Sequence, residues 1–175
     1  MAGKEIRKVY CFMIEADRLQ IYLASSQRGA VRVGLFLDKG PDCISYFKRT
    51  YPDNALVEDK EMNYPLLVAV ESALAGGPVS KGIRLDIKHT PFQMKAWQGI
   101  RAIPFGETKT YGEVADMAGC PGGARAIGQA MHRNPLPLIF PCHRVVAAKG
   151  LGGFGGGLEL KKYLLNREKP LSNSL

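Results

Sequence analysis

The chain has 175 residues, enough for one domain or two small ones, and its 46% apolar and 23% charged content is ordinary for a globular protein. No apolar run approaches membrane-spanning length and the first eight residues lack the apolar core of a secretion signal, so we expect no membrane partner. The four cysteines have neither paired nor zinc-type spacing, which argues against a disulfide framework and favours a reducing intracellular compartment, the cytoplasm or a eukaryotic nucleus.

The formal net charge of +8 is unevenly distributed along the chain. Residues 1–87 carry a net charge of +1, whereas residues 88–175 carry +7. A solvated basic surface is a common explanation, but a bias of this size in one half is also typical of a domain that contacts phosphates. The distribution therefore fits a nucleic-acid partner better than a small-molecule enzyme.

The first half predicts a small α/β domain, residues 1–87, built on an antiparallel sheet. Three β-rich runs separated by turns, 8–14, 18–24 and 29–37, indicate a meander. Further elements are expected as a short edge strand at 43–48, a loop or helix start at 53–62, a helix at 64–75 and a last strand at 83–87. None of these residues indicates a catalytic role.

The second half, residues 88–175, predicts a mostly helical domain. Thr90 as N-cap and Pro91 at the first helical position predict a helix over 91–101. The capping-box pattern Thr110–Glu113 predicts another helix ending near 118, and a glycine-containing turn separates it from a third helix at 124–133. Two helices joined in this way are typical of a helix-turn-helix. A final helix is expected at 158–168 and a frayed tail at 169–175.

The helix at 124–133 has two distinct faces. Its core-facing residues are expected to be Ile127, Ala130 and Met131, which recur at helical spacing. The other face carries Arg125, Gln129 and His132, and the small residues Ala124, Ala126 and Gly128 leave the surface low. This pattern fits either an amphipathic helix with a small-residue packing surface or a helix that presses closely against DNA.

The stretch 134–146 carries the reactive chemistry of the chain. Prolines stiffen its start, the apolar run 138–140 predicts a buried strand, and Pro141 places Cys142 at the end of that strand. Cys142 is followed by His143 and Arg144, and a neighbouring base or cation raises the thiolate fraction of a cysteine. Adjacent residues of an extended chain point to opposite faces, so His143 would reach the sulfur only after a backbone bend or through a water. A buried structural cysteine is the alternative interpretation.

The segment 150–155 formally matches the dinucleotide-binding pattern G-x-G-x-x-G. Only 20 residues follow Gly155, too few to complete a βαβ unit with its acidic ribose ligand. We therefore interpret these glycines as flexible residues that line a pocket.

The motif Pro141-Cys-His-Arg-Val-Val146, with Asn134-Pro135 upstream, resembles the active-site motif of the O6-alkylguanine-DNA alkyltransferases, also called methylated-DNA–protein-cysteine methyltransferases. The resemblance covers most of the second half of the chain. It extends through Thr90–Trp97, Ile103–Thr108, Thr110–Glu113, Ala124–Gly128, Gly155–Leu158 and Leu164–Glu168.

The resemblance implies a winged-helix-like second domain whose recognition helix enters the minor groove of double-stranded DNA. It implies that Cys142 takes an alkyl group once and irreversibly from O6 of guanine, and from O4 of thymine, in a base rotated out of the duplex. We expect a monomer with no cofactor and no metal.

The resemblance also assigns roles by motif position. Catalytic roles fall to Cys142, to His143 as the base acting through a water, to Glu168 orienting it, to Tyr111 as proton donor to the base, and to Asn134 linking helix and strand. Arg125 would fill the gap left by the extruded nucleotide. The expected DNA-contacting residues are Arg125, Ala124, Ala126, Gly128, Gln129, His132 and Thr110, and the expected pocket residues are Met131, Pro137, Val145, Phe154 and Gly155.

Phe154 and Gly155 replace a tyrosine and a hydroxyl-bearing residue found in some members, which leaves the accepted alkyl size open. Two other functions compete with transfer. One is a non-catalytic sensor of alkylated DNA, in which relatives lack the nucleophilic cysteine. The other is a cysteine hydrolase, which the adjacent Cys-His spacing fits poorly.

Overall fold

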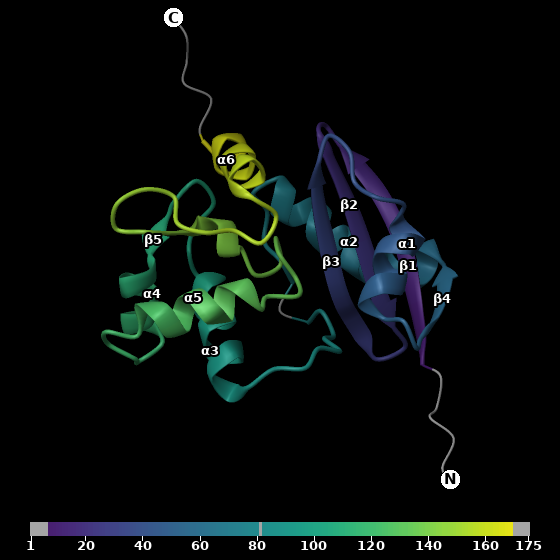
Figure 1. Ribbon diagram of the computed structural model, residues 1–175, viewed down its shortest axis with the longest axis horizontal. Coiled ribbons are helices and arrows are strands. Elements are labelled where there is room, and N and C mark those ends of the chain that lie inside the picture. Colours follow the sequence, from purple (N-terminus) through teal and green to yellow (C-terminus); the bar gives the residue numbers. More distant parts are fainter. Residues whose placement is uncertain (1–6, 81, 170–175) are drawn as a thin grey trace, which may run out of the picture. The chain divides into compact units, whose positions relative to one another are not determined.

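The computed structural model describes residues 7–80 and 82–169 (Figure 1). The chain divides into two compact units. The first contains the chain up to Ser72 together with Pro78–Ile87, and the second contains Ala73–Gly77 together with the chain from Lys88 onward.

The first unit is built on a four-stranded sheet in the order β3-β2-β1-β4. Strands β1 (Lys8–Ala16), β2 (Leu19–Ser26) and β3 (Gly29–Leu37) form the predicted antiparallel meander. The sheet is nevertheless mixed, because β4 (Ala55–Glu58) pairs with β1 in parallel. The expectation of a loop or helix start at 53–62 therefore missed a strand.

The predicted edge strand at 43–48 is wrong, because this segment forms helix α1 (Cys43–Thr50). Asp42 caps the helix by accepting a hydrogen bond from the Ser45 N–H at 2.8 Å. Phe47 is fully buried in a cluster with residues of the sheet. Capping and the burial of one face outweigh the β-propensity of the Ile-Ser-Tyr-Phe run.

Helix α2 (Lys60–Leu74) lies behind the sheet in Figure 1, whereas α1 lies in front of it. The buried Asn63 amide of α2 donates to the Tyr10 carbonyl of β1 at 3.0 Å. The predicted last strand at 83–87 is reduced to one bridge between Leu85 and Ala30, so the expected strand is wrong.

The second unit packs three helices together: α3 (Pro91–Ile100), α4 (Tyr111–Met117) and α5 (Ala124–His132). Both α3 and α4 begin with a complete capping box. The only tryptophan, Trp97, is buried in α3, and its indole N–H donates to the Ala130 carbonyl of α5 at 2.8 Å. The predicted starts of these helices are confirmed.

The predicted strand at 138–140 is wrong, although all three side chains are buried as expected. Leu138 adopts a positive φ of 74°, and the Phe140 N–H donates to the Leu136 carbonyl at 2.9 Å. These residues therefore form a turn. The chain continues as a short 3₁₀ helix η1 (Cys142–Arg144) and strand β6 (Val145–Val146), which pairs in parallel with β5 (Lys109–Thr110).

Helix α6 (Leu158–Arg167) is the last element of the second unit in chain order. Leu160 and Leu164 are buried, and Tyr163 is half-buried. The expected C-terminal tail lies outside the described residues except for Lys169. Within the described ranges, no helix is both long and apolar enough to cross a membrane.

Candidate active site

Cys142 lies at the start of η1, at one side of a cavity of about 330 Å³. The side chain is only 8% exposed. The cavity is lined by Tyr111, Gly128, Met131, His132, Cys142, Gly153, Phe154 and Gly155. The structure therefore brings the cysteine together with four residues expected near it from the sequence as catalytic or pocket residues: Tyr111, Met131, Phe154 and Gly155. Pro137 and Val145 do not belong to this lining.

Asn134 connects the end of α5 to the reactive cysteine. Its side-chain amide donates to the Phe140 carbonyl at 2.8 Å and to the Cys142 sulfur at 3.2 Å. Its side-chain oxygen accepts from the Leu136 N–H at 3.0 Å. The three contacts fix the turn 134–141 and place a hydrogen-bond donor on the sulfur.

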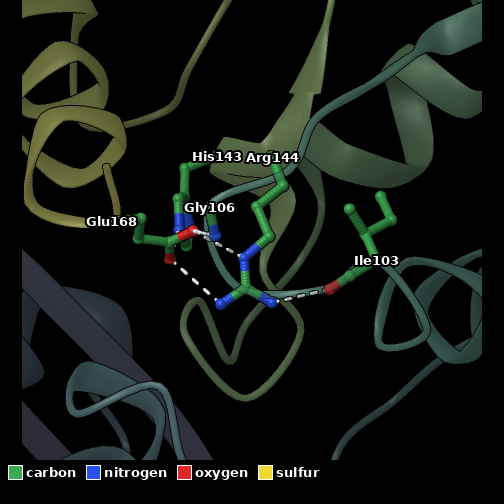
Figure 2. A network of polar contacts seen from close by, with 5 residues as sticks. All are labelled: Ile103, Gly106, His143, Arg144 and Glu168. Atoms are coloured by element: carbon green, nitrogen blue, oxygen red, sulfur yellow. Dashed lines mark hydrogen bonds and ion pairs between the residues drawn. The ribbon is translucent and has the colours of Figure 1, made fainter. Parts of the chain in front are cut away.

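His143, which follows Cys142 in the chain, forms a buried pair with Glu168 (Figure 2). The His143 Nε2 atom lies 2.6 Å from Glu168 Oε1. Glu168 follows directly after α6, so the pair joins η1 to the end of the last helix. Cys142 and His143 lie in a 3₁₀ turn, so the alternation of side chains expected for an extended chain does not apply to them.

Two further groups hold the Glu168 carboxylate, and sequence reasoning assigned neither of them. Arg144 donates to both oxygens, from Nε at 2.9 Å and from Nη2 at 3.0 Å. The Gly106 N–H donates to Oε2 at 3.1 Å. Arg144 also donates from Nη1 to the Ile103 carbonyl at 2.8 Å, and Figure 2 shows its guanidinium lying between the two partners.

The protonation states follow from these contacts. Burial raises the pKa of Glu168, but hydrogen bonds from His143 and Arg144 outweigh it and lower the pKa to about 2. Burial lowers the pKa of His143 from its ordinary value, against the pull of Glu168. At neutral pH the pair is therefore a carboxylate and a neutral imidazole. The carboxylate only accepts, so Nε2 carries the proton and Nδ1 keeps its lone pair.

The Nδ1 atom of His143 is buried and makes no hydrogen bond within residues 7–80 and 82–169. A nitrogen with a free lone pair is a base. The arrangement thus places an available proton acceptor on the residue that follows Cys142.

The resting state of Cys142 differs from the sequence-based expectation. Burial raises the pKa of the thiol, and the opposing effects of the Asn134 hydrogen bond and the Lys161 charge do not overcome it. The sulfur is therefore a thiol at neutral pH rather than a preformed thiolate, and a base must remove its proton before it can act as a nucleophile.

Tyr111 stands at the start of α4 and borders the same cavity. Its hydroxyl donates to the Gly153 carbonyl at 3.3 Å. Burial raises the pKa of the phenol, so Tyr111 remains protonated and able to donate.

Lys161 is a buried residue of α6 that sequence reasoning also missed. Its ammonium donates to the carbonyls of Val145 and Leu151 at 2.6 Å each and of Gly153 at 3.2 Å. These bonds hold the glycine-containing segment that borders the cavity. Its helical spacing from the buried Leu164 was the available signal, because residues three apart share a face.

The helix α5 shows the two faces expected from the sequence. Ile127, Ala130 and Met131 are buried. Six residues of this helix are expected to contact DNA. Four of them are exposed, namely Arg125, Ala126, Gln129 and His132, and the other two, Ala124 and Gly128, are half-buried. His132 and Gly128 also border the cavity, which places this helix at its mouth.

Thr110, the remaining residue expected at DNA, is the N-cap of α4. Its hydroxyl accepts from the Glu113 N–H at 3.2 Å and donates to the Glu113 carboxylate at 2.8 Å. Within the described chain, no three His, Cys, Asp or Glu residues gather into a group suited to a metal ion.

A thiol held beside a His-Glu pair, in a cavity bordered by an exposed basic helix, defines a nucleophilic cysteine site next to a surface suited to phosphates. Residues 91–170 match the family model described as 6-O-methylguanine DNA methyltransferase, DNA binding domain. The chain belongs to the family of methylated-DNA–protein-cysteine methyltransferases, because proteins of that name are 33% and 35% identical to it over most of both chains.

Three relatives illustrate the extent of the likeness. The methylated-DNA–protein-cysteine methyltransferase of Methanosarcina acetivorans is 35% identical over 161 residues, which cover 91% of this chain and 98% of that protein. The protein of the same name from Mycobacterium leprae is 48% identical over 101 residues, but the match spans only 57% of this chain and 61% of its relative. The crystal structure of Mycobacterium tuberculosis OGT in complex with DNA superimposes with a TM-score of 0.70 at 32% identity, covering 93% of this chain and 92% of that one.

Proposed function

We propose that this protein repairs alkylated DNA by transferring an alkyl group from O6 of guanine, and from O4 of thymine, to the sulfur of Cys142. The observation that carries the proposal is the position of Cys142 in the lining of a cavity, with a hydrogen-bond donor on its sulfur and a buried His143–Glu168 pair that begins at the next residue of the chain. Family membership gives this geometry its substrate class.

The proton path follows from the protonation states at the site. The Cys142 thiol gives its proton through a water to Nδ1 of His143, and Glu168 stabilises the imidazolium that forms. The sulfur then forms a bond to the alkyl carbon as the bond from that carbon to O6 breaks. Tyr111 donates a proton to the departing base and recovers one from the His143 imidazolium through solvent, so the net result is transfer of the thiol proton to guanine.

The reaction stops after one event. The product is a thioether, which has no easy leaving group, so each protein molecule is consumed. This stoichiometry distinguishes the proposal from a cysteine hydrolase, which requires turnover.

For DNA recognition, we propose that α4 and α5 act as a helix-turn-helix within a winged-helix-like domain, with α5 entering the minor groove. Small residues on the exposed side of α5 permit close approach, and Arg125 fills the space left by the extruded nucleotide. In this proposal residues 88–175 form the alkyltransferase and DNA-binding domain, and residues 1–87 serve as a scaffold. We expect the protein to act as a monomer inside the cell.

The principal experiment mixes the protein with a duplex oligonucleotide that carries radiolabelled O6-methylguanine. Stoichiometric label on Cys142, with an intact-mass gain of one methyl group, supports transfer. Binding without label supports a sensor, and release of label with turnover supports a hydrolase. Cys142→Ala should abolish labelling while DNA binding persists, because the α5 surface is unchanged; undiminished labelling of this variant would rule out the assignment.

A second experiment tests base extrusion. Arg125→Ala should slow transfer from duplex DNA more than transfer from the free alkylated base, since only the duplex requires a filled gap. Gln129→Ala, which changes the same exposed face without removing a charge, is the matched control. An equal loss on both substrates would contradict the extrusion role of Arg125.

A further inference from the structure

The strongest feature not used by the proposed reaction is the number of donors on one carboxylate. Glu168 accepts from His143 Nε2, from Nε and Nη2 of Arg144, and from the Gly106 N–H. Its side chain is 7% exposed, and that of Arg144 is 10% exposed. The guanidinium is also anchored at the far side by the Ile103 carbonyl, so its orientation is fixed independently of Glu168.

The charges in this cluster balance only because Arg144 is present. With Arg144, the buried group contains one carboxylate, one guanidinium and a neutral imidazole. Without it, the buried carboxylate would keep only the neutral imidazole and the Gly106 N–H as donors, and its uncompensated negative charge would draw a proton onto the pair. A protonated pair has no base left for the Cys142 thiol.

The other charged or titratable groups near the pair do not replace the guanidinium. The Lys161 ammonium of α6 donates its three hydrogen bonds to main-chain carbonyls. The Cys142 thiol and the Tyr111 phenol are neutral at physiological pH, because burial raises the pKa of each.

We propose that Arg144 is a positioning residue for the transfer: by pairing with both oxygens of Glu168 it excludes an additional proton from the His143–Glu168 pair and keeps Nδ1 of His143 available to the thiol. This inference rests on the proposed function. It adds that Arg144, Glu168 and His143 together determine the protonation state of the base. In this arrangement the arginine does not contact the substrate.

The first test measures the single-turnover rate of methyl transfer against pH from 5 to 9 for the wild type, Arg144→Met and Arg144→Lys. In the wild type the acid-side midpoint should lie below 6.5, since burial lowers the pKa of His143 from that value. In Arg144→Met the midpoint should move up by about 1 to 3 pH units, the usual effect of losing an opposite charge at this range. Arg144→Lys keeps the charge but not the paired geometry, so its rate should fall with a smaller displacement of the midpoint.

Arg18→Met is the matched control, because Arg18 makes a similar two-bond pair with Asp38, at 2.7 and 2.6 Å, in the first unit. Its profile should coincide with that of the wild type. A uniform loss of rate in Arg144→Met with an unmoved midpoint would show a purely structural role and overturn the proposal.

The second test needs neither a foldable variant nor transfer activity. The ring ¹⁵N shifts of His143 in the wild type should report a predominantly neutral imidazole, protonated at Nε2, at pH 6.5 and above, because burial lowers its pKa from that value. The protein has only three histidines, which simplifies assignment. Titration of His143 near its ordinary pKa would overturn the proposal. Absence of methyl transfer in the wild type would instead count against the proposed function, so the two failures are distinguishable.

Discussion

Replacing Glu168 by glutamine should destabilise the second unit in a pH-dependent way. The carboxylate is nearly fully buried, and its pKa of about 2 lies below the ordinary value of 4.5. A displacement of this size corresponds to roughly 3 kcal/mol of stability at pH 7. Independently, removal of one partner from a buried ion pair costs about 3 to 5 kcal/mol, so the two estimates agree.

The pH dependence has a definite sign. Because the pKa of Glu168 is lower in the folded state, the carboxylate stabilises the fold above the unfolded-state pKa, near 4.5, and this contribution is lost as the pH falls toward 2. The difference in unfolding free energy between wild type and Glu168→Gln should therefore shrink from roughly 3 kcal/mol at pH 7 to about 1.4 kcal/mol at pH 3.

Urea denaturation followed by tryptophan fluorescence is the appropriate assay. Trp97 is the only tryptophan and is buried in the second unit, so its emission reports the unfolding of the unit that holds Glu168. Glu159→Gln is the control, because Glu159 is exposed and pairs with the nearby Lys162 of the same helix. A stability difference that stays constant from pH 7 to pH 3 would refute the assigned ionisation of Glu168.

Three further substitutions test the remaining contacts. Tyr111→Phe should slow single-turnover transfer by about 100-fold or more without weakening DNA binding, as expected for loss of a proton donor; a rate within a few-fold of wild type would argue against that role. Asn134→Ala should lower the unfolding free energy by roughly 1 to 3 kcal/mol and shift iodoacetamide labelling of Cys142 to higher pH, because a donor to the sulfur is lost. Lys161→Met should remove one donor from each of three carbonyls and accelerate proteolysis within residues 147–157, and unchanged cleavage would contradict the anchoring function.

The elements that the sequence predicted well are those with strong local signals. The capping patterns at Thr90 and Thr110 placed two helix starts because side-chain caps act within four residues. The strands of the meander were found for the same reason, since turns separate clear β-rich runs. Segments with weaker signals failed: 43–48 became a helix through its Asp42 cap and the burial of Phe47, which depends on the distant sheet.

The candidate site shows the same division. Cys142, His143 and Asn134 were available from one short motif, and Glu168 and Tyr111 only from resemblance to a family. The buried roles of Arg144 and Lys161 were missed because charged side chains are expected at the surface. Only the fold brings Arg144 to Glu168, and Lys161 to three main-chain carbonyls. The turn at 138–140 was missed because an apolar run does not reveal that Leu138 adopts a positive φ.

The burial of the Cys142 sulfur has a consequence for the interval before a lesion is encountered. Oxidants and small electrophiles attack thiolates far faster than thiols, and the raised pKa of Cys142 holds the group as a thiol. If each molecule acts once, as proposed, it cannot replace a sulfur lost to such side reactions. Under the proposed mechanism, this low resting reactivity preserves the pool of intact molecules, because activation occurs only when His143 removes the proton.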